Sequence, residues 1–115
     1  MAIYVETLNP KQIVENIKKK IDDNKIDTWS YDADGDFVHD VDQWRYSAWL
    51  RPRIENNRVV FGILGRTDRK MSTVEYAVYH GRFVEMLLSH FDDDCNAINV
   101  TPLPVSEYDK IGEEK

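Results

Sequence analysis

Two segments with helical periodicity enclose a stretch in which the hydrophobic period is two, and this change of period constrains the fold most strongly. Residues 10–23 and residues 73–91 carry apolar side chains at helical spacing. Between them, the apolar residues come in short runs separated by turn residues such as Asp34-Gly35. The pattern predicts a block of neighbouring strands between two helices, which is an α+β fold.

Both helices begin with recognisable start signals. Asn9 stands at an N-cap position before Pro10, and Leu8 occupies the hydrophobic-staple position ahead of the cap. Ser72 and Glu75 have the spacing of a capping box. We therefore expect one helix over residues 10–23 and a second, more buried helix over residues 73–91.

The second helix is expected to bury one apolar stripe against the sheet. Phe83 and Leu87 widen this stripe, whose members are Val74, Ala77, Val78, Gly81, Val84, Leu88 and Phe91. A glycine inside a helix costs about 1 kcal/mol relative to alanine. Close packing of helix on sheet is the expected reason for Gly81, and a ligand approaching the backbone is the alternative.

Four or five strands complete the expected fold. Residues 28–31 and 37–39 predict a hairpin, residues 43–54 a long strand, residues 59–65 a strand apolar on both faces, and residues 96–101 a final strand. The order α-β-β-β-β-α-β predicts a two-layer sandwich, with an antiparallel sheet of about four to five strands and two helices on one face. We expect a single α+β domain over residues 1–115, with a frayed tail from about residue 108.

The composition predicts a cytoplasmic protein. Hydrophobic residues make up 42% of the chain, which is enough for a packed core. Cys95 is the only cysteine, so no intrachain disulfide is possible. The first ten residues lack the pattern of a signal peptide, and no run approaches the roughly 18 apolar residues of a membrane span.

Charge alternates in sign along the chain. The net charge is −6, with +1 over residues 1–25, −6 over residues 26–44, +5 over residues 45–70 and −6 over residues 71–115. The acidic total argues against non-specific nucleic-acid binding, which requires a basic surface.

No metal or other cofactor is predicted. The run Asp32-Ala33-Asp34-Gly35-Asp36 resembles the start of a calcium loop, but its glycine stands at the fourth position instead of the sixth. A turn explains these residues better. His39, His80, His90 and Cys95 do not show the close spacing of a zinc site.

The outward row of the long strand is the leading binding candidate. It consists of Arg45, Trp49, Arg51 and Arg53, and Trp and Arg are enriched where proteins bind one another. The alternative interpretation is a ladder of ion pairs with aspartates of a neighbouring strand. On the first interpretation the chain is a small non-enzymatic binding module that recognises a protein partner or forms a homodimer.

A different class of function stays open at the second helix. His80 and Arg82 lie on either side of Gly81. If they line a pocket between this helix and the sheet, the chain is a small enzyme or a ligand-binding protein. The sequence contains no nucleophile elbow, phosphate loop or dinucleotide fingerprint. Catalysis is therefore the weaker expectation.

Overall fold

The structure is a computed structural model that describes residues 1–111. Its elements are β1 (Ile3–Glu6), α1 (Pro10–Asp22), β2 (Trp29–Tyr31), β3 (Phe37–His39), β4 (Ala48–Glu55), β5 (Arg58–Gly65), α2 (Thr73–His90) and β6 (Ala97–Val100). The α+β class and the order from α1 to β6 are confirmed. β1 was not predicted, and β4 begins five residues later than expected, because residues 43–47 form a turn.

The strands form one antiparallel sheet in the order β2-β3-β4-β5-β1-β6. It has six strands instead of the expected four to five, and the additional strand lies inside the sheet. Val5 of β1 pairs with Val59 of β5 on one side and with Ile98 of β6 on the other. β1 is only four residues long, so its alternation of Ile3 and Val5 with polar neighbours was too short to identify.

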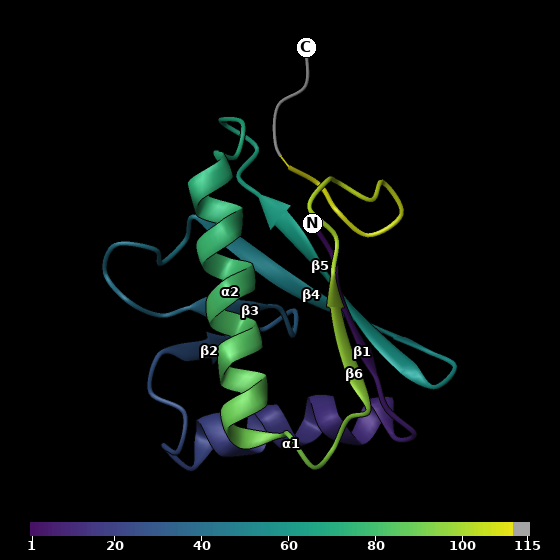
Figure 1. The fold of residues 1–115 in the computed structure, drawn as a ribbon. Coiled ribbons are helices and arrows are strands. Elements are labelled where there is room, and N and C mark those ends of the chain that lie inside the picture. Colours follow the sequence, from purple (N-terminus) through teal and green to yellow (C-terminus); the bar gives the residue numbers. More distant parts are fainter. Residues whose placement is uncertain (112–115) are drawn as a thin grey trace.

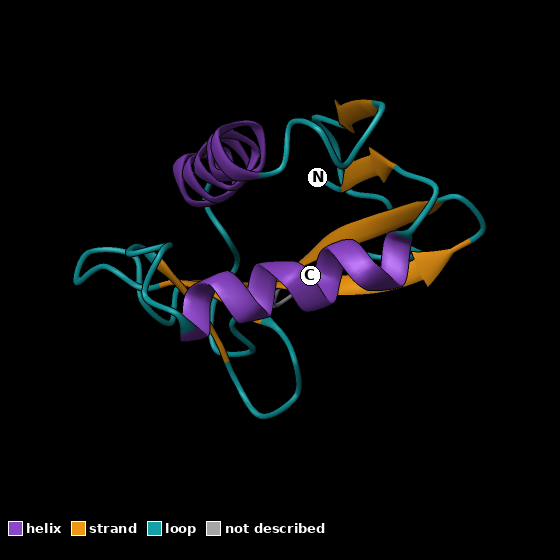
Figure 2. Cartoon of the chain, turned by 90° about the horizontal axis from the view of Figure 1, so that it is seen from below, coloured by secondary structure: helices purple, strands orange, loops and turns teal. Residues whose placement is uncertain are grey.

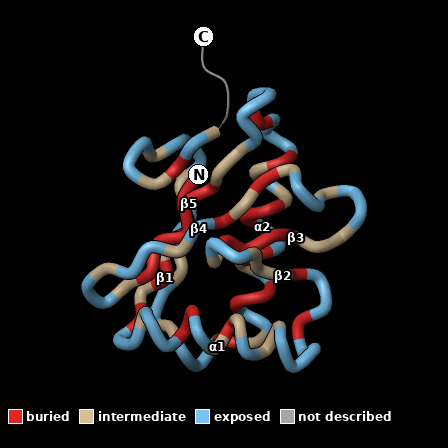
Figure 3. Tube along the Cα trace, turned by 180° about the vertical axis from the view of Figure 1, so that it is seen from behind, coloured by how far each residue is buried: buried red, intermediate tan, exposed pale blue. Residues whose placement is uncertain are grey.

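Both helices pack on the same face of the sheet, as expected (Figures 1 and 2). In Figure 1 α2 stands upright in front of the strands, and α1 crosses below it. Ile17 of α1 and Phe83 of α2 join Leu50 and Phe61 of the sheet in one buried cluster. Figure 3 shows the buried residues concentrated in the central strands of the sheet.

The predicted starts of both helices are confirmed, with Asn9 as the N-cap of α1 and Ser72 as the N-cap of α2. Ser72 Oγ accepts a hydrogen bond from Glu75 N at 3.2 Å, and Ser72 N donates to Glu75 Oε1 at 2.8 Å. The Arg69 guanidinium pairs with the same carboxylate, and this pair together with the Ser72 hydrogen bonds lowers the pKa of Glu75 to about 2. Asn9 makes no capping hydrogen bond through its side chain, and Leu8 is 75% exposed, so it forms no staple.

The face that α2 buries matches the predicted stripe only at Phe83, Leu87 and, at its C-cap, Phe91. Its buried residues are Glu75, Tyr79, His80, Phe83, Met86 and Leu87. Tyr79 and Phe83 are long enough to reach the aromatic core, where both rings lie edge-on against Trp29. Most of the predicted stripe points the other way. α2 is apolar on both sides, so periodicity alone could not identify its inner face.

The chain after β6 crosses the face of the sheet opposite the helices. Tyr108 lies on Gly62, where a Cβ atom would come within 2.1 Å of the Tyr108 carbonyl oxygen. Asp109 is buried, and Lys110 forms a bridge with Leu64. Residues 108–111 of the tail that was expected to fray thus lie against the sheet, and residues 112–115 lie outside the described part. Within residues 1–111, no helix combines the length and the apolar character that crossing a membrane requires.

Candidate functional site

Only three of the four residues predicted to form the Arg/Trp row lie together on one face of β4. Trp49, Arg51 and Arg53 alternate along β4 on the face opposite the helices, because Leu50 between them points into the core. Arg45 lies in the turn before β4 and does not continue the row.

The arginines of this surface have carboxylate partners within the chain. Arg51 forms two hydrogen bonds with Asp36, at 2.9 and 2.8 Å. Arg45 pairs with Asp40 and, at 3.2 Å, with Asp42. These pairs, which raise the pKa of Arg45 and Arg51, match the ion-pair interpretation more closely than a free basic surface.

Arg53 belongs to a smaller cluster on the same face. Its guanidinium carbon lies 5.3 Å from the centre of the Tyr108 ring, and its Nε lies 3.9 Å from Glu55 Oε2. Tyr108 Oη donates to the same Glu55 oxygen at 2.6 Å. This hydrogen bond is the largest cause that lowers the pKa of Glu55. The cluster holds residues 105–111, the C-terminal segment, on the sheet, which is a structural role.

Trp49 keeps one accessible edge. It is half-buried and lies with Tyr46 beside a shallow depression that the turn after β5 completes. Tyr46 is 60% exposed. The two rings leave an aromatic surface at the start of β4.

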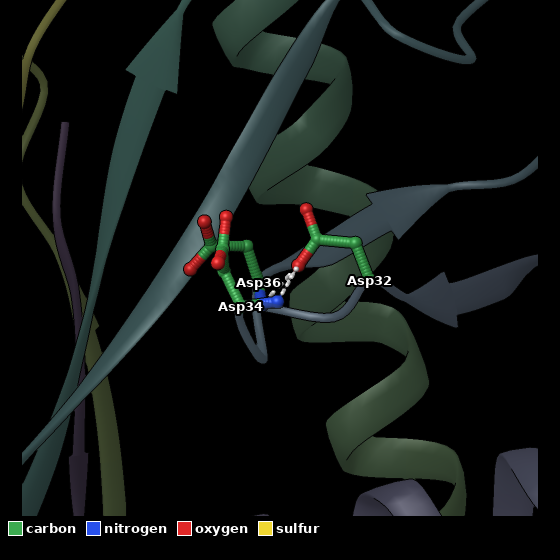
Figure 4. Close-up of side chains that lie close together, drawn as sticks. All are labelled: Asp32, Asp34 and Asp36. Atoms are coloured by element: carbon green, nitrogen blue, oxygen red, sulfur yellow. Dashed lines mark hydrogen bonds between the residues drawn. The ribbon is translucent and has the colours of Figure 1, made fainter.

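The three aspartates of the β2–β3 turn come close together (Figure 4). Asp32, Asp34 and Asp36 each offer a carboxylate oxygen within 4.8 Å of the others. Asp32 Oδ1 accepts hydrogen bonds from the backbone N–H groups of Asp34 and Asp36, each at 3.0 Å. Gly35 has a φ of 84°, as the predicted hairpin turn requires. Because Arg51 already neutralises Asp36, the cluster is explained as turn chemistry.

His80 and Arg82, the second predicted pair, point to different parts of the molecule. His80 is buried, with Nδ1 2.6 Å from the Tyr76 carbonyl and Nε2 bonded to the Met1 carbonyl. Burial lowers the pKa of His80. It joins α2 to the start of the chain and does not share a pocket with Arg82.

Arg82 instead meets His39 of β3 beside a pocket. Arg82 Nη1 lies 3.2 Å from His39 Nε2, and His39 Nδ1 lies 2.9 Å from the Thr28 carbonyl. The imidazole is stacked on Trp29 with ring centres 4.6 Å apart. Burial lowers the pKa of His39, and the charge of Arg82 lowers it further. The pocket has a volume of about 420 Å³ and lies between α2, β3 and the loop after α1.

The outer side of α2 differs from an ordinary helix surface. We define the outer face of α2 by the apolar and small residues on its side away from the sheet: Val74, Ala77, Val78, Gly81, Val84 and Leu88. Val78 and Val84 are half-buried, and Val84 at the border of this face also contacts the core. Val74 is 60% exposed and Leu88 is 56% exposed. A Cβ atom at Gly81 would have no atom within 4 Å outside its own helix, so the expected close packing of Gly81 on the sheet is wrong. In Figure 1 no other segment passes in front of this face.

Gly81→Ala should therefore stabilise the monomer. Alanine favours the helical backbone by about 0.5–1 kcal/mol, and the open space leaves no clash to offset this gain. Urea unfolding of dilute protein measures the change. A loss of stability would show that Gly81 contacts the fold after all.

No family model, no curated protein and no solved structure matches this chain.

Two parts of this geometry were not predicted from the sequence. His39 was considered only as a metal ligand, and its contact with Arg82 joins residues 43 positions apart. The outer face of α2 was recognised as a stripe but assigned to the core. A signal was present, since α2 has only two charged residues, Arg82 and Glu85, between Glu75 and its end.

Proposed function

We propose that this chain is a protein-interaction module that pairs with a second copy of itself through the outer face of α2. The main evidence for this proposal is that apolar side chains of this face are exposed to solvent. A surface helix ordinarily presents charged and polar residues to water. Here Val74 and Leu88 are more than half exposed, and the residues between them on this face are small or apolar except for Glu85. A contiguous apolar surface of this kind is typical of a site that binds another protein.

The spacing of the face favours a second copy, arranged antiparallel. Val74 comes seven residues before Gly81, and Leu88 seven residues after it. If two α2 helices run antiparallel and cross at Gly81, each Val74 meets the partner's Leu88, about 10 Å from the crossing point. Val78 and Val84, each three residues from Gly81, meet in the same way. The missing side chain at Gly81 lets the two backbones approach closely at the centre.

The position of the charged residues also favours an antiparallel arrangement of the two helices. Arg82 lies at the flank and is engaged with His39, so Glu85 is the one charged residue close to the middle of the face. In an antiparallel pair the two Glu85 residues are separated by about 12 Å along the helices, beyond the Debye length of about 8 Å. A parallel pair would place them at the same height, where they repel each other.

The size of the contact predicts a weak dimer. α2 has 18 residues and is about 27 Å long. A strip of that length and one helix wide is smaller than the roughly 800 Å² per partner of a standard interface. We therefore expect a dissociation constant of about 10 μM or weaker.

Sedimentation equilibrium from about 1 μM to about 1 mM tests the proposal. The wild type should shift from monomer to dimer across this range, and Leu88→Glu should remain a monomer, because it buries a charge against the partner's Val74. Leu8→Glu is the matched control, since Leu8 is 75% exposed and lies outside α2. It should dimerise as the wild type does.

A charge exchange tests the direction of the helices. Val74→Lys combined with Leu88→Glu should restore dimerisation, because an antiparallel pair places the new charges opposite each other. Wild type that sediments as a monomer at every concentration contradicts the proposal. A dimer that Trp49→Ala dissociates and Leu88→Glu does not would move the interface to β4.

A further inference from the structure

Arg82 differs from every other arginine in the chain. Arg45, Arg51, Arg53, Arg58, Arg66 and Arg69 each have a carboxylate oxygen within 4.0 Å. Among residues 1–111, Arg82 alone has none, although the chain is acidic overall. Its hydrogen bond is to the neutral ring of His39. A guanidinium that lacks an anion and lines a pocket is suited to an anionic ligand.

His39 holds the guanidinium in place without neutralising it. The Nδ1 hydrogen bond to Thr28 places the proton on Nδ1, so Nε2 presents its lone pair to Arg82. The ring itself is fixed by stacking on Trp29 and by an edge contact with Tyr79. One of the five N–H donors of Arg82 is used in this contact, which leaves donors for a ligand.

The rest of the lining restricts the ligand. The charged residues around the pocket are Lys25 and Arg82 against Asp27 and Glu85, with His90 and Ser89 as further polar groups. Ile26, Trp29 and Met86, which are themselves buried, form the apolar floor of the pocket. Two carboxylates at the pocket disfavour a doubly charged anion such as phosphate. A single carboxylate matches the planar fork of Arg82 and adds only one negative charge.

We propose that the pocket beside α2 binds a small molecule that carries one carboxylate, with the carboxylate on Arg82 and an apolar part against Trp29 and Met86. The volume of about 420 Å³ suits a small organic molecule. Either a simple organic acid or an amino acid supplies this chemistry, and Glu85 or Asp27 would favour the amino acid by pairing with its ammonium group.

An NMR titration with sodium phenylacetate tests the proposal, with sodium chloride at the same ionic strength as the reference. We expect saturable shifts at Arg82, His39 and the Trp29 indole, with a dissociation constant of about 1–10 mM. Arg82→Gln should weaken binding about tenfold or more. Arg66→Gln is the matched control, because Arg66 is exposed and pairs with Asp68 away from this pocket. It should bind as the wild type does.

Neutral phenylacetamide and inorganic phosphate complete the test. The amide should bind about tenfold more weakly than phenylacetate, and phosphate more weakly still. The proposal is overturned if phenylacetate gives no saturable shift, or if Arg82→Gln binds phenylacetate as tightly as the wild type does. It is also overturned if the amide binds as tightly as phenylacetate, or if phosphate binds more tightly. Phenylalanine then separates the two sources: tighter binding than phenylacetate assigns the site to amino acids, and weaker binding assigns it to simple acids. Thermal unfolding of Arg82→Gln checks that the variant is folded.

Discussion

Gly62→Ala should destabilise the protein by about 3 kcal/mol. Gly62 lies in the middle of β5, and the backbone of Tyr108 passes directly above it. The added Cβ would lie 2.1 Å from the Tyr108 carbonyl oxygen and 2.7 Å from its carbonyl carbon. Both are backbone atoms, so no side-chain rotation relieves the clash. The C-terminal segment must move away from the sheet, and the contacts of Tyr108 with Glu55 and Arg53 are lost with it.

Urea unfolding measures the loss, and hydrogen exchange locates it. The amide of Lys110, which donates to the Ile63 carbonyl at 2.9 Å, should exchange much faster in the variant. Gly81→Ala is the matched control, because the same chemical change there meets open space and is expected to stabilise. A Gly62→Ala variant within about 1 kcal/mol of the wild type would show that residues 105–111 do not rest on β5 as described.

The C-terminal segment also shows what sequence patterns could not predict. Both helices could be predicted because their start signals, Pro10 and the Ser72–Glu75 capping box, involve residues that are close in sequence. The hairpin turn at Gly35 depends on neighbouring residues in the same way. The contact between Gly62 and Tyr108 depends on residues 46 positions apart, and neither residue carries a local signal of it. Periodicity likewise identified α2 but not its inner side.

The same limit explains the candidate site. The ion-pair alternative, which the charge blocks supported, placed arginines of the long strand against aspartates of a neighbouring strand, and the pair of Arg51 with Asp36 is an example. The contact of Arg82 with His39 follows from no such block. It depends on how α2 is rotated on the sheet, and the packing of Tyr79 and Phe83 sets that rotation.

Asp109→Ala should cost about 3–5 kcal/mol, the largest loss that we predict for a single polar side chain. The carboxylate of Asp109 is fully buried. Oδ1 accepts from the backbone N–H of Ile63 at 2.8 Å, and Oδ2 accepts from the backbone N–H of Val105 at 2.7 Å. Alanine removes both acceptors and leaves two donors without partners. Each such donor costs about 1–3 kcal/mol.

Two further variants separate this cause from a general effect of charge. Asp42→Ala removes a carboxylate that is 100% exposed and weakly paired with Arg45, so it should change stability by less than about 1 kcal/mol. Asp109→Asn keeps one acceptor oxygen and places an amide N–H₂ group where the other oxygen stood. One backbone donor then keeps its partner, so the stability of Asp109→Asn should lie between those of the wild type and Asp109→Ala. If Asp109→Ala unfolds at the same urea concentration as Asp42→Ala, the carboxylate does not hold the C-terminal segment on the sheet.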